Sequence, residues 1–103
     1  MKKYNKLVRD KVPDVLKRKG KKYEAHVAND EEYWQTLKQK LLEETEEFLE
    51  SEGEEEIADI LDVLDEIFEF MGLKRKYIEF VRKQKAKEKG KFKKRIILEK
   101  AEV

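Results

Sequence analysis

The stretch from residue 40 to residue 71 decides the fold, because two helical patterns meet there at a short break. It reads KLLEETEEFLE over residues 40–50, SEG over residues 51–53 and EEEIADILDVLDEIFEFM over residues 54–71. A break this short favours an antiparallel helix hairpin. The expected fold class is therefore all-α, an antiparallel bundle of about four helices within a single domain over residues 1–103.

Four carboxylates are predicted to converge across this hairpin. On the first helix, Glu44 and Glu47 are three residues apart and therefore share a face. On the second helix, Glu56 and Asp59 share a face for the same reason. Folding the chain at the break places Glu47 level with Glu56. One turn further from the loop, it places Glu44 level with Asp59.

Two of these acids stand inside apolar stripes. Glu44 fills the slot between Leu41 and Phe48, and Glu56 continues a stripe that begins at Ile60. An acid in such a position is costly to bury unless it is paired or bound to a metal ion. Like charges this close also repel each other. A hard divalent cation with oxygen ligands, Mg²⁺ or Mn²⁺, would remove both penalties.

A simpler interpretation is an acidic helix surface that faces solvent. The stretch is rich in glutamate, and acidic pairs three residues apart occur by chance on many exposed helices. Two pairs placed symmetrically about one break, with two of their four members in apolar stripes, favour the metal-binding interpretation. The solvated surface remains open as the alternative.

Composition narrows the classes of function. Charged residues make up 48% of the chain but the net charge is only +1, which argues against a uniformly basic nucleic-acid binder. The chain has no cysteine, so a disulfide framework and a thiolate zinc site are excluded. No run approaches the roughly 18 apolar residues that a membrane helix needs. We expect a cytoplasmic protein without a membrane partner, and nucleic acid is not the expected partner.

Helix and turn signals divide the rest of the chain into short elements. The expected elements are a helix from an Asp10 cap to Lys19, a weak strand at 23–27, a helix from an Asp30 cap to about Leu49, a helix over 73–89 and a strand at 96–98. The two strands would pair as a small β ribbon, which needs packing against the helices to be stable. The helix over about 54–71 is so apolar that other helices or a subunit interface must cover more than one face.

The two acidic motifs, ExxE at 44–47 and ExxD at 56–59, resemble the signature of the all-α nucleotide pyrophosphatases. That superfamily includes MazG-type, dimeric dUTPase-type and phosphoribosyl-ATP pyrophosphohydrolase-type enzymes. The segments YNKLVRDKVP at 4–13 and KxxxKGxF at 85–92 extend the resemblance to its small phosphoribosyl-ATP pyrophosphohydrolase-like or MazG-like branch, over nearly the whole chain. The connection between the acidic motifs is shorter than in typical MazG domains, which leaves the base preference open.

The resemblance implies Mg²⁺-dependent hydrolysis of a nucleoside triphosphate, or of a phosphoribosyl-ATP-like compound, between the α and β phosphates. The products would be a monophosphate and pyrophosphate, the role would be the clearing of non-standard nucleotides, and the assembly would be a homodimer or homotetramer. The implied metal ligands are Glu44, Glu47, Glu56 and Asp59, with Glu43 as a neighbouring carboxylate that positions or deprotonates the water. The candidate phosphate-binding residues are Asn5, Lys6, Arg9, Lys11, Lys85 and Lys89.

A second hypothesis is a non-enzymatic helical module that binds RNA or a protein partner through the basic fourth helix. It is motivated by the density of lysine over residues 73–94. The carboxylates discriminate between the two hypotheses, because a binding module has no use for Glu44 and Glu56 inside apolar stripes. A third hypothesis keeps the fold and the metal site without the activity.

Overall fold

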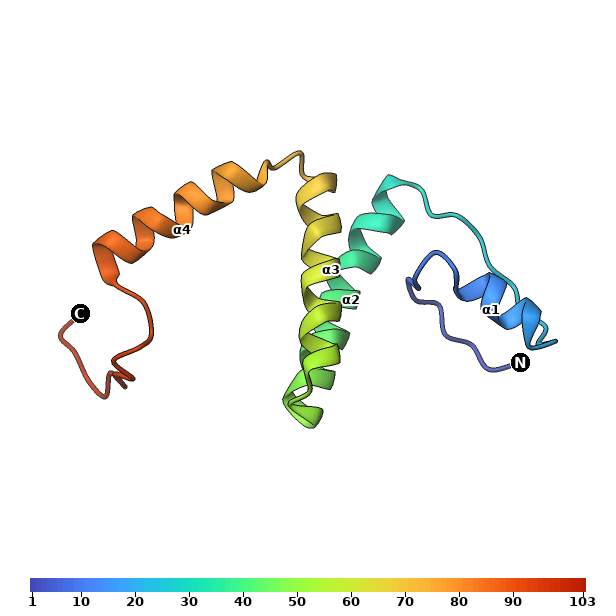
Figure 1. The fold of residues 1–103 in the computed structure, drawn as a ribbon, viewed down its shortest axis with the longest axis horizontal. Helices are drawn as coiled ribbons and strands as arrows, with labels where there is room; N and C mark the ends of the chain where they lie inside the picture. The colour runs from blue at the N-terminus through green and yellow to red at the C-terminus, as the bar shows by residue number, and fades with distance from the viewer. The chain divides into compact units, whose positions relative to one another are not determined.

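The computed structural model describes all of residues 1–103, and its regular structure consists of four α-helices (Figure 1). They are α1 (Val12–Arg18), α2 (Asp30–Ser51), α3 (Glu54–Phe70) and α4 (Arg75–Lys89). The predicted all-α class is confirmed. The chain divides into two compact units, residues 1–71 and residues 72–103.

The predicted β ribbon is absent. Residues 23–27 and residues 96–98 are both irregular, and nearly all of their side chains are exposed. The strand prediction was wrong because a segment of three to five residues offers few ladder hydrogen bonds, and an isolated pair of strands is marginal in water without a packed face.

The helix starts differ from the prediction by one residue. The N-cap of α2 is Asn29, whose side-chain oxygen accepts a hydrogen bond of 2.9 Å from the backbone N–H of Glu32. Asp30 was predicted as the cap but lies in the first turn, where its charge favours the helix dipole. Lys11, not Asp10, precedes α1, and Pro13 occupies the first turn as predicted.

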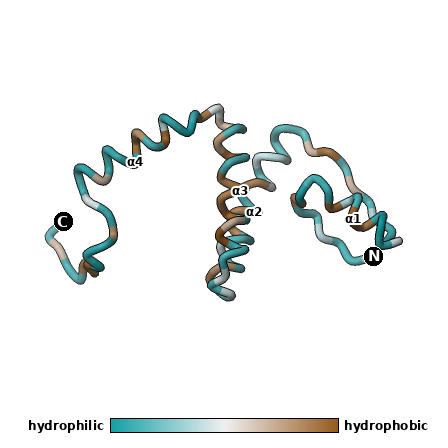
Figure 2. The backbone as a smooth tube through the Cα atoms, in the orientation of Figure 1, coloured by the Kyte–Doolittle hydropathy of each residue, from teal (hydrophilic) through white to brown (hydrophobic).

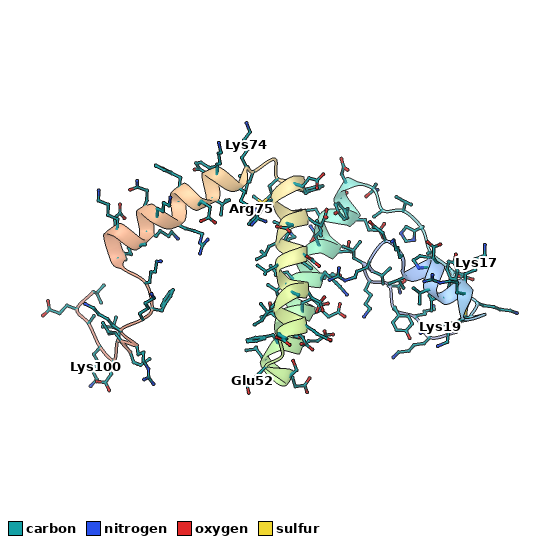
Figure 3. The ribbon with its side chains drawn as sticks, viewed as in Figure 1. Lys17, Lys19, Glu52, Lys74, Arg75 and Lys100 are labelled. Carbon is teal, nitrogen blue, oxygen red and sulfur yellow. The ribbon has the colours of Figure 1, made fainter.

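Glu52 and Gly53 alone connect α2 to α3 (Figure 3, where Glu52 is labelled). Glu52 adopts the left-handed conformation, with φ of 53° and ψ of 29°, and its N–H donates to the carbonyl of Phe48 at 2.7 Å. Gly53 is extended, but a Cβ atom there would lie 2.6 Å from Oε2 of Glu56. The backbone strain therefore falls on Glu52, whereas Gly53 allows the close approach of Glu56.

Helices α2 and α3 lie side by side and antiparallel (Figure 1). The ring of Phe70 stacks on Trp34, with centroids 5.1 Å apart, and meets Tyr33 edge-on at 5.7 Å. Tyr33 and Phe70 each lie 14 residues further from the turn than positions 47 and 56, the pair that the sequence predicts to be level. The aromatic contacts therefore agree with the predicted register.

The hairpin encloses a small core. Leu37 is 1% exposed and is the one fully buried apolar residue, and Glu44, at 5%, is the one buried charged residue. Figure 2 shows hydrophobic positions along much of α3. Much of this apolar surface stays outside the contact with α2, so one hairpin covers only part of it. The exposed large apolar residues of the pair are Leu42, Leu49, Ile57, Leu61 and Phe70.

The second unit consists of α4 and the irregular segment after it. Helix α4 ends at Gly90, which has a φ of 77° and donates its N–H to the carbonyl of Ala86. Residues 72–103 contain 13 Lys or Arg against 4 Asp or Glu, whereas residues 1–71 contain 12 against 20. The nearly neutral chain therefore consists of an acidic unit and a basic unit. None of the four helices is both long and apolar enough to span a lipid bilayer.

Candidate metal centre

Helix α2 brings three carboxylates together. Glu43, Glu44 and Glu47 each contribute one oxygen to a group in which these atoms all lie within 4.8 Å of one another. Glu47 lies four residues after Glu43 and three after Glu44, so helix geometry places it beside both of them. We call these three residues the acidic cluster.

Glu44 is the buried member of the acidic cluster. Its Oε1 lies 3.4 Å from Nζ of Lys40, but its Oε2 is buried without a hydrogen-bond partner. Burial raises the pKa of Glu44, and the negative charges of Glu47 and Asp59 raise it further. A buried oxygen without a partner is uncommon in native proteins, and either a bound ion or a proton shared with Glu47 would account for it.

Glu43, the preceding residue, differs from Glu44 because both of its carboxylate oxygens have partners. Nζ of Lys6 donates to its Oε1 at 2.8 Å, and Nζ of Lys40 donates to its Oε2 at 3.3 Å. The hydrogen bond from Lys6 is the main cause of a lowered pKa at Glu43, and the charge of Lys40 adds to it. Both oxygens of Glu43 are therefore engaged, whereas Glu44 keeps one oxygen without a partner.

Helix α3, the partner of α2 in the hairpin, contributes two further carboxylates, Asp59 and Asp62. Nη2 of Arg9 donates to Oδ1 of Asp59 at 2.6 Å and to Oδ2 of Asp62 at 2.8 Å. These two hydrogen bonds raise the pKa of Arg9. Asp59 also contributes to the raised pKa of Glu44, so a carboxylate of α3 and a carboxylate of α2 interact through their charges.

The turn-proximal pair lies where the sequence predicts it. Glu47 and Glu56 line one open surface depression together with Glu50 and Ser51. Glu56 is half-buried because Gly53 leaves room for its carboxylate. The tight connection therefore keeps a carboxylate of α3 beside a carboxylate of α2.

The predicted ligands thus fall into two groups. Glu44 and Glu47 belong to the acidic cluster, whereas Glu56 borders it at the depression and Asp59 interacts with it through charge. Glu43, which the sequence suggested as a neighbour of the metal ligands, is the third member of the cluster.

The predicted phosphate-binding residues are distributed unevenly. Lys6 and Arg9 reach the site from the segment before α1 and pair with its carboxylates. Asn5 and Lys11, in the same segment, make no ion pair or side-chain hydrogen bond. The remaining two candidates, Lys85 and Lys89, lie on α4 in the second unit.

Sequence reasoning missed Lys40. Its Nζ lies 3.3 Å from Glu43 and 3.4 Å from Glu44, and its side chain is only 17% exposed. The spacing could have identified it, because a lysine three and four residues before two acids lies on their side of a helix. The abundance of lysine elsewhere in the chain hid that signal.

The residues present fit a hard divalent cation. The acidic cluster offers three carboxylates from α2, and carboxylate oxygens are the ligands that Mg²⁺ and Mn²⁺ prefer. It also contains Oε2 of Glu44, a buried acceptor without a donor. Glu44 and Glu47 are the best placed to hold such an ion, and Glu56 and Asp59 approach from α3.

Comparisons of the chain with family models, with curated proteins and with solved structures found no match. The resemblance to the all-α nucleotide pyrophosphatases therefore stays a prediction from the sequence motifs.

Proposed function

We propose that this chain is a Mg²⁺-dependent nucleotide pyrophosphohydrolase. It cleaves a nucleoside triphosphate or a phosphoribosyl-ATP-like compound between the α and β phosphates and releases a monophosphate and pyrophosphate. The observation that carries this proposal is the buried carboxylate of Glu44, whose Oε2 has no partner although Glu47 and Asp59 add negative charge beside it. A surface that only faces solvent gives no reason for that arrangement.

The carboxylates divide the work. Glu44 and Glu47 would hold the cation from α2, and Glu56 and Asp59 would contribute to its binding from α3. A bound Mg²⁺ supplies neutralisation of phosphate oxygens and lowers the pKa of a coordinated water. Glu43 is fixed by hydrogen bonds to two lysines and positions the attacking water. Glu43 and Glu44 are thus the candidate catalytic residues.

Lys6 and Arg9 hold the phosphates. In the structure each already lies at the site and satisfies carboxylates, at 2.8 Å and 2.6 Å respectively. Phosphate oxygens are alternative acceptors for the same donors, and the planar guanidinium of Arg9 suits them especially well. Asn5, Lys11, Lys85 and Lys89 are the further candidates for the leaving pyrophosphate.

The proposal includes a second copy of the chain that covers the exposed apolar side of the hairpin. The resulting assembly is a homodimer or homotetramer, which acts on nucleotides in the cytoplasm. It is supported by exposed side chains of Ile57 and Leu61 on α3, which is too apolar for a solvated helix. Light scattering on the purified chain tests the assembly, and a monomer would contradict it.

The proposed reaction is tested by pyrophosphate release from a panel of common and modified nucleoside triphosphates. Wild type, Glu44→Gln and the matched control Glu46→Gln, an exposed acid on the same helix, are assayed with Mg²⁺, with Mn²⁺ and with EDTA. We expect metal-dependent release of monophosphate and pyrophosphate that Glu44→Gln abolishes and Glu46→Gln retains.

Absence of release from every compound would contradict the enzyme hypothesis. If the same protein bound RNA in a salt-sensitive manner, and Glu44→Gln left that binding unchanged, the basic unit of residues 72–103 would be the functional surface instead.

A further inference from the structure

We infer that Lys40 is a further ligand for the substrate phosphates, held beside the site by Glu43 and Glu44 until Glu44 is used to bind a cation. The inference rests on the proposed function and adds a residue to it. Lys40 thus has two successive partners, carboxylate oxygens in the free protein and phosphate oxygens in the complex.

The distances identify Lys40 as the most loosely held basic group at the site. Its Nζ lies 3.3 Å from Oε2 of Glu43 and 3.4 Å from Oε1 of Glu44. By contrast, Lys6 lies 2.8 Å from its partner and Arg9 lies 2.6 Å from Asp59. Charged N–H···O hydrogen bonds are usually about 2.7–2.9 Å long. The ammonium of Lys40 is therefore shared between two acceptors without a short bond to either.

The scaffold makes Lys40 the best positioned of these groups. It lies on α2 one turn before the acidic cluster, so helix geometry fixes its distance from Glu43 and Glu44. Its side chain is 17% exposed, against 40% for Lys6 and 60% for Arg9, which come from the irregular segment before α1. A donor on a rigid element holds its position more accurately than one on a loop.

Charge balance explains why its partner changes. Oε2 of Glu44 has no partner, and Oε1 of the same carboxylate is one of the two acceptors of Lys40. A divalent cation held by Glu44 repels the ammonium and weakens the hold of that carboxylate on it. Substrate phosphates at the cation bring new acceptors within reach of the three N–H donors of Lys40.

Two titrations of the full chain test this inference, both by isothermal calorimetry. The first measures Mn²⁺ alone, and the second measures methylenediphosphonate, a diphosphate analogue without a base, in the presence of Mg²⁺. The variants are Lys40→Met and Lys40→Gln, which remove the charge, and Lys40→Arg, which keeps it. Lys38→Met is the matched control, because Lys38 lies on the same helix over the ring of Trp34.

We expect opposite shifts in the two titrations. Lys40→Met and Lys40→Gln bind Mn²⁺ at least threefold more tightly, because a competing positive charge has gone, and bind methylenediphosphonate at least tenfold more weakly. Lys40→Arg stays within about threefold of wild type for the diphosphonate, because arginine keeps the positive charge and also donates to phosphate oxygens. Lys38→Met leaves both affinities unchanged.

Parallel loss of both affinities in Lys40→Met and Lys40→Gln would show a purely structural role and overturn the inference. Unchanged diphosphonate binding in these variants would overturn it as well, and circular dichroism establishes that each variant is folded. If wild type binds no Mn²⁺, the proposed function and this inference fail together. If wild type releases pyrophosphate but Lys40→Met binds the diphosphonate normally, only the inference fails.

Discussion

Two regions of the α2–α3 hairpin bury very different side chains: one buries aromatic rings that pack together, and the other buries a carboxylate. At the end far from the turn, Trp34 and Tyr33 pack against Phe70, and the hydroxyl of Tyr33 donates to Glu66 at 3.3 Å. Nearer the turn, the carboxylate of Glu44 is buried and one of its oxygens has no partner. We call the group of Tyr33, Trp34 and Phe70 the aromatic end.

The difference separates stability from chemistry on one pair of helices. At the aromatic end, ring contacts gain free energy and the hydroxyl of Tyr33 finds an acceptor in Glu66. At the acidic cluster, the same helix contact costs free energy, because it removes Glu44 from water beside other negative charges. A folded chain can keep such a cost only where other contacts compensate for it, as the aromatic end does here.

The largest expected effect is the loss of packing beside the aromatic end. Leu37 is the most buried apolar side chain of the hairpin, so Leu37→Ala should lower the free energy of unfolding by about 2–5 kcal/mol, measured by urea denaturation. Leu42→Ala, an exposed leucine on the same helix, should change it by less than about 0.5 kcal/mol. Equal losses for the two variants would show that the packing is not concentrated at Leu37.

Glu44→Gln, unlike Leu37→Ala, should stabilise the folded chain. Without divalent cations at pH 7, it should raise the free energy of unfolding, because a buried charge near other acids is replaced by a neutral amide. The control Glu46→Gln should leave it unchanged. Saturating Mn²⁺ should then stabilise wild type more than Glu44→Gln, because a ligand stabilises the state that binds it. A destabilised Glu44→Gln would show that its pairing with Lys40 outweighs the cost of burial.

The pH dependence of stability tests independently whether the charge of Glu44 destabilises the folded chain. The pKa of Glu44 is raised in the folded state, so the folded chain binds this proton more readily than the unfolded chain. Proton binding by Glu44 therefore stabilises the folded chain. This contribution is complete below the ordinary pKa of 4.5, and it is lost as the pH rises through the pKa of the folded state. The stability advantage of Glu44→Gln over wild type should therefore disappear on acidification below pH 4.5, as followed by thermal unfolding at several pH values. An advantage that grew on acidification would contradict the sign.

Lys6→Met should change the pKa of Glu43 but not the cause of the raised pKa of its neighbour Glu44. Its hydrogen bond is the main cause of the lowered pKa of Glu43, so that pKa should rise toward its ordinary value. The raised pKa of Glu44 has burial as its main cause and should stay raised. Carbon-detected NMR titration of the side-chain carboxyls follows both groups in one sample. Equal upward movement of both pKa values would mean that Lys6 neutralises the whole acidic cluster rather than Glu43.

The smallest expected effect lies at the turn. Glu52 is left-handed, a conformation that favours glycine, so Glu52→Gly should stabilise the hairpin by up to about 1 kcal/mol. Glu50→Gly places the same residue inside α2 and should destabilise it by up to about 1 kcal/mol. Chemical denaturation of the two variants checks the contrast, and losses in both would mean that Glu52 makes contacts that offset its strain.

The hairpin and its register could be predicted from the sequence because periodicity and the break act together. Two apolar stripes set the facing sides, and the two-residue connection leaves little freedom for one helix to slide along the other. The positions of Glu44 and Asp59 follow from that register alone. Helix caps were less predictable, because Asn29 and Asp30 are both good capping residues and only the backbone decides between them.

The individual partners of the carboxylates could not be predicted. Lys6 and Arg9 precede α1, and no helical period connects them to α2 or α3. Their recognition as basic candidates came from the resemblance, and their pairing with Glu43 and Asp59 required the folded chain. Lys40 was predictable in principle from its spacing, but 25 lysines and arginines in 103 residues make any one such spacing weak.

The short connection between α2 and α3 also sets the order in which the site forms during folding. A two-residue turn closes with little loss of chain entropy, so the carboxylates nearest the turn should meet early. The contacts of Lys6 with Glu43 and of Arg9 with Asp59 close loops of 37 and 50 residues, and should therefore form later. A nascent hairpin would thus carry its carboxylates without their basic partners, and divalent cations should accelerate its folding more than they slow its unfolding.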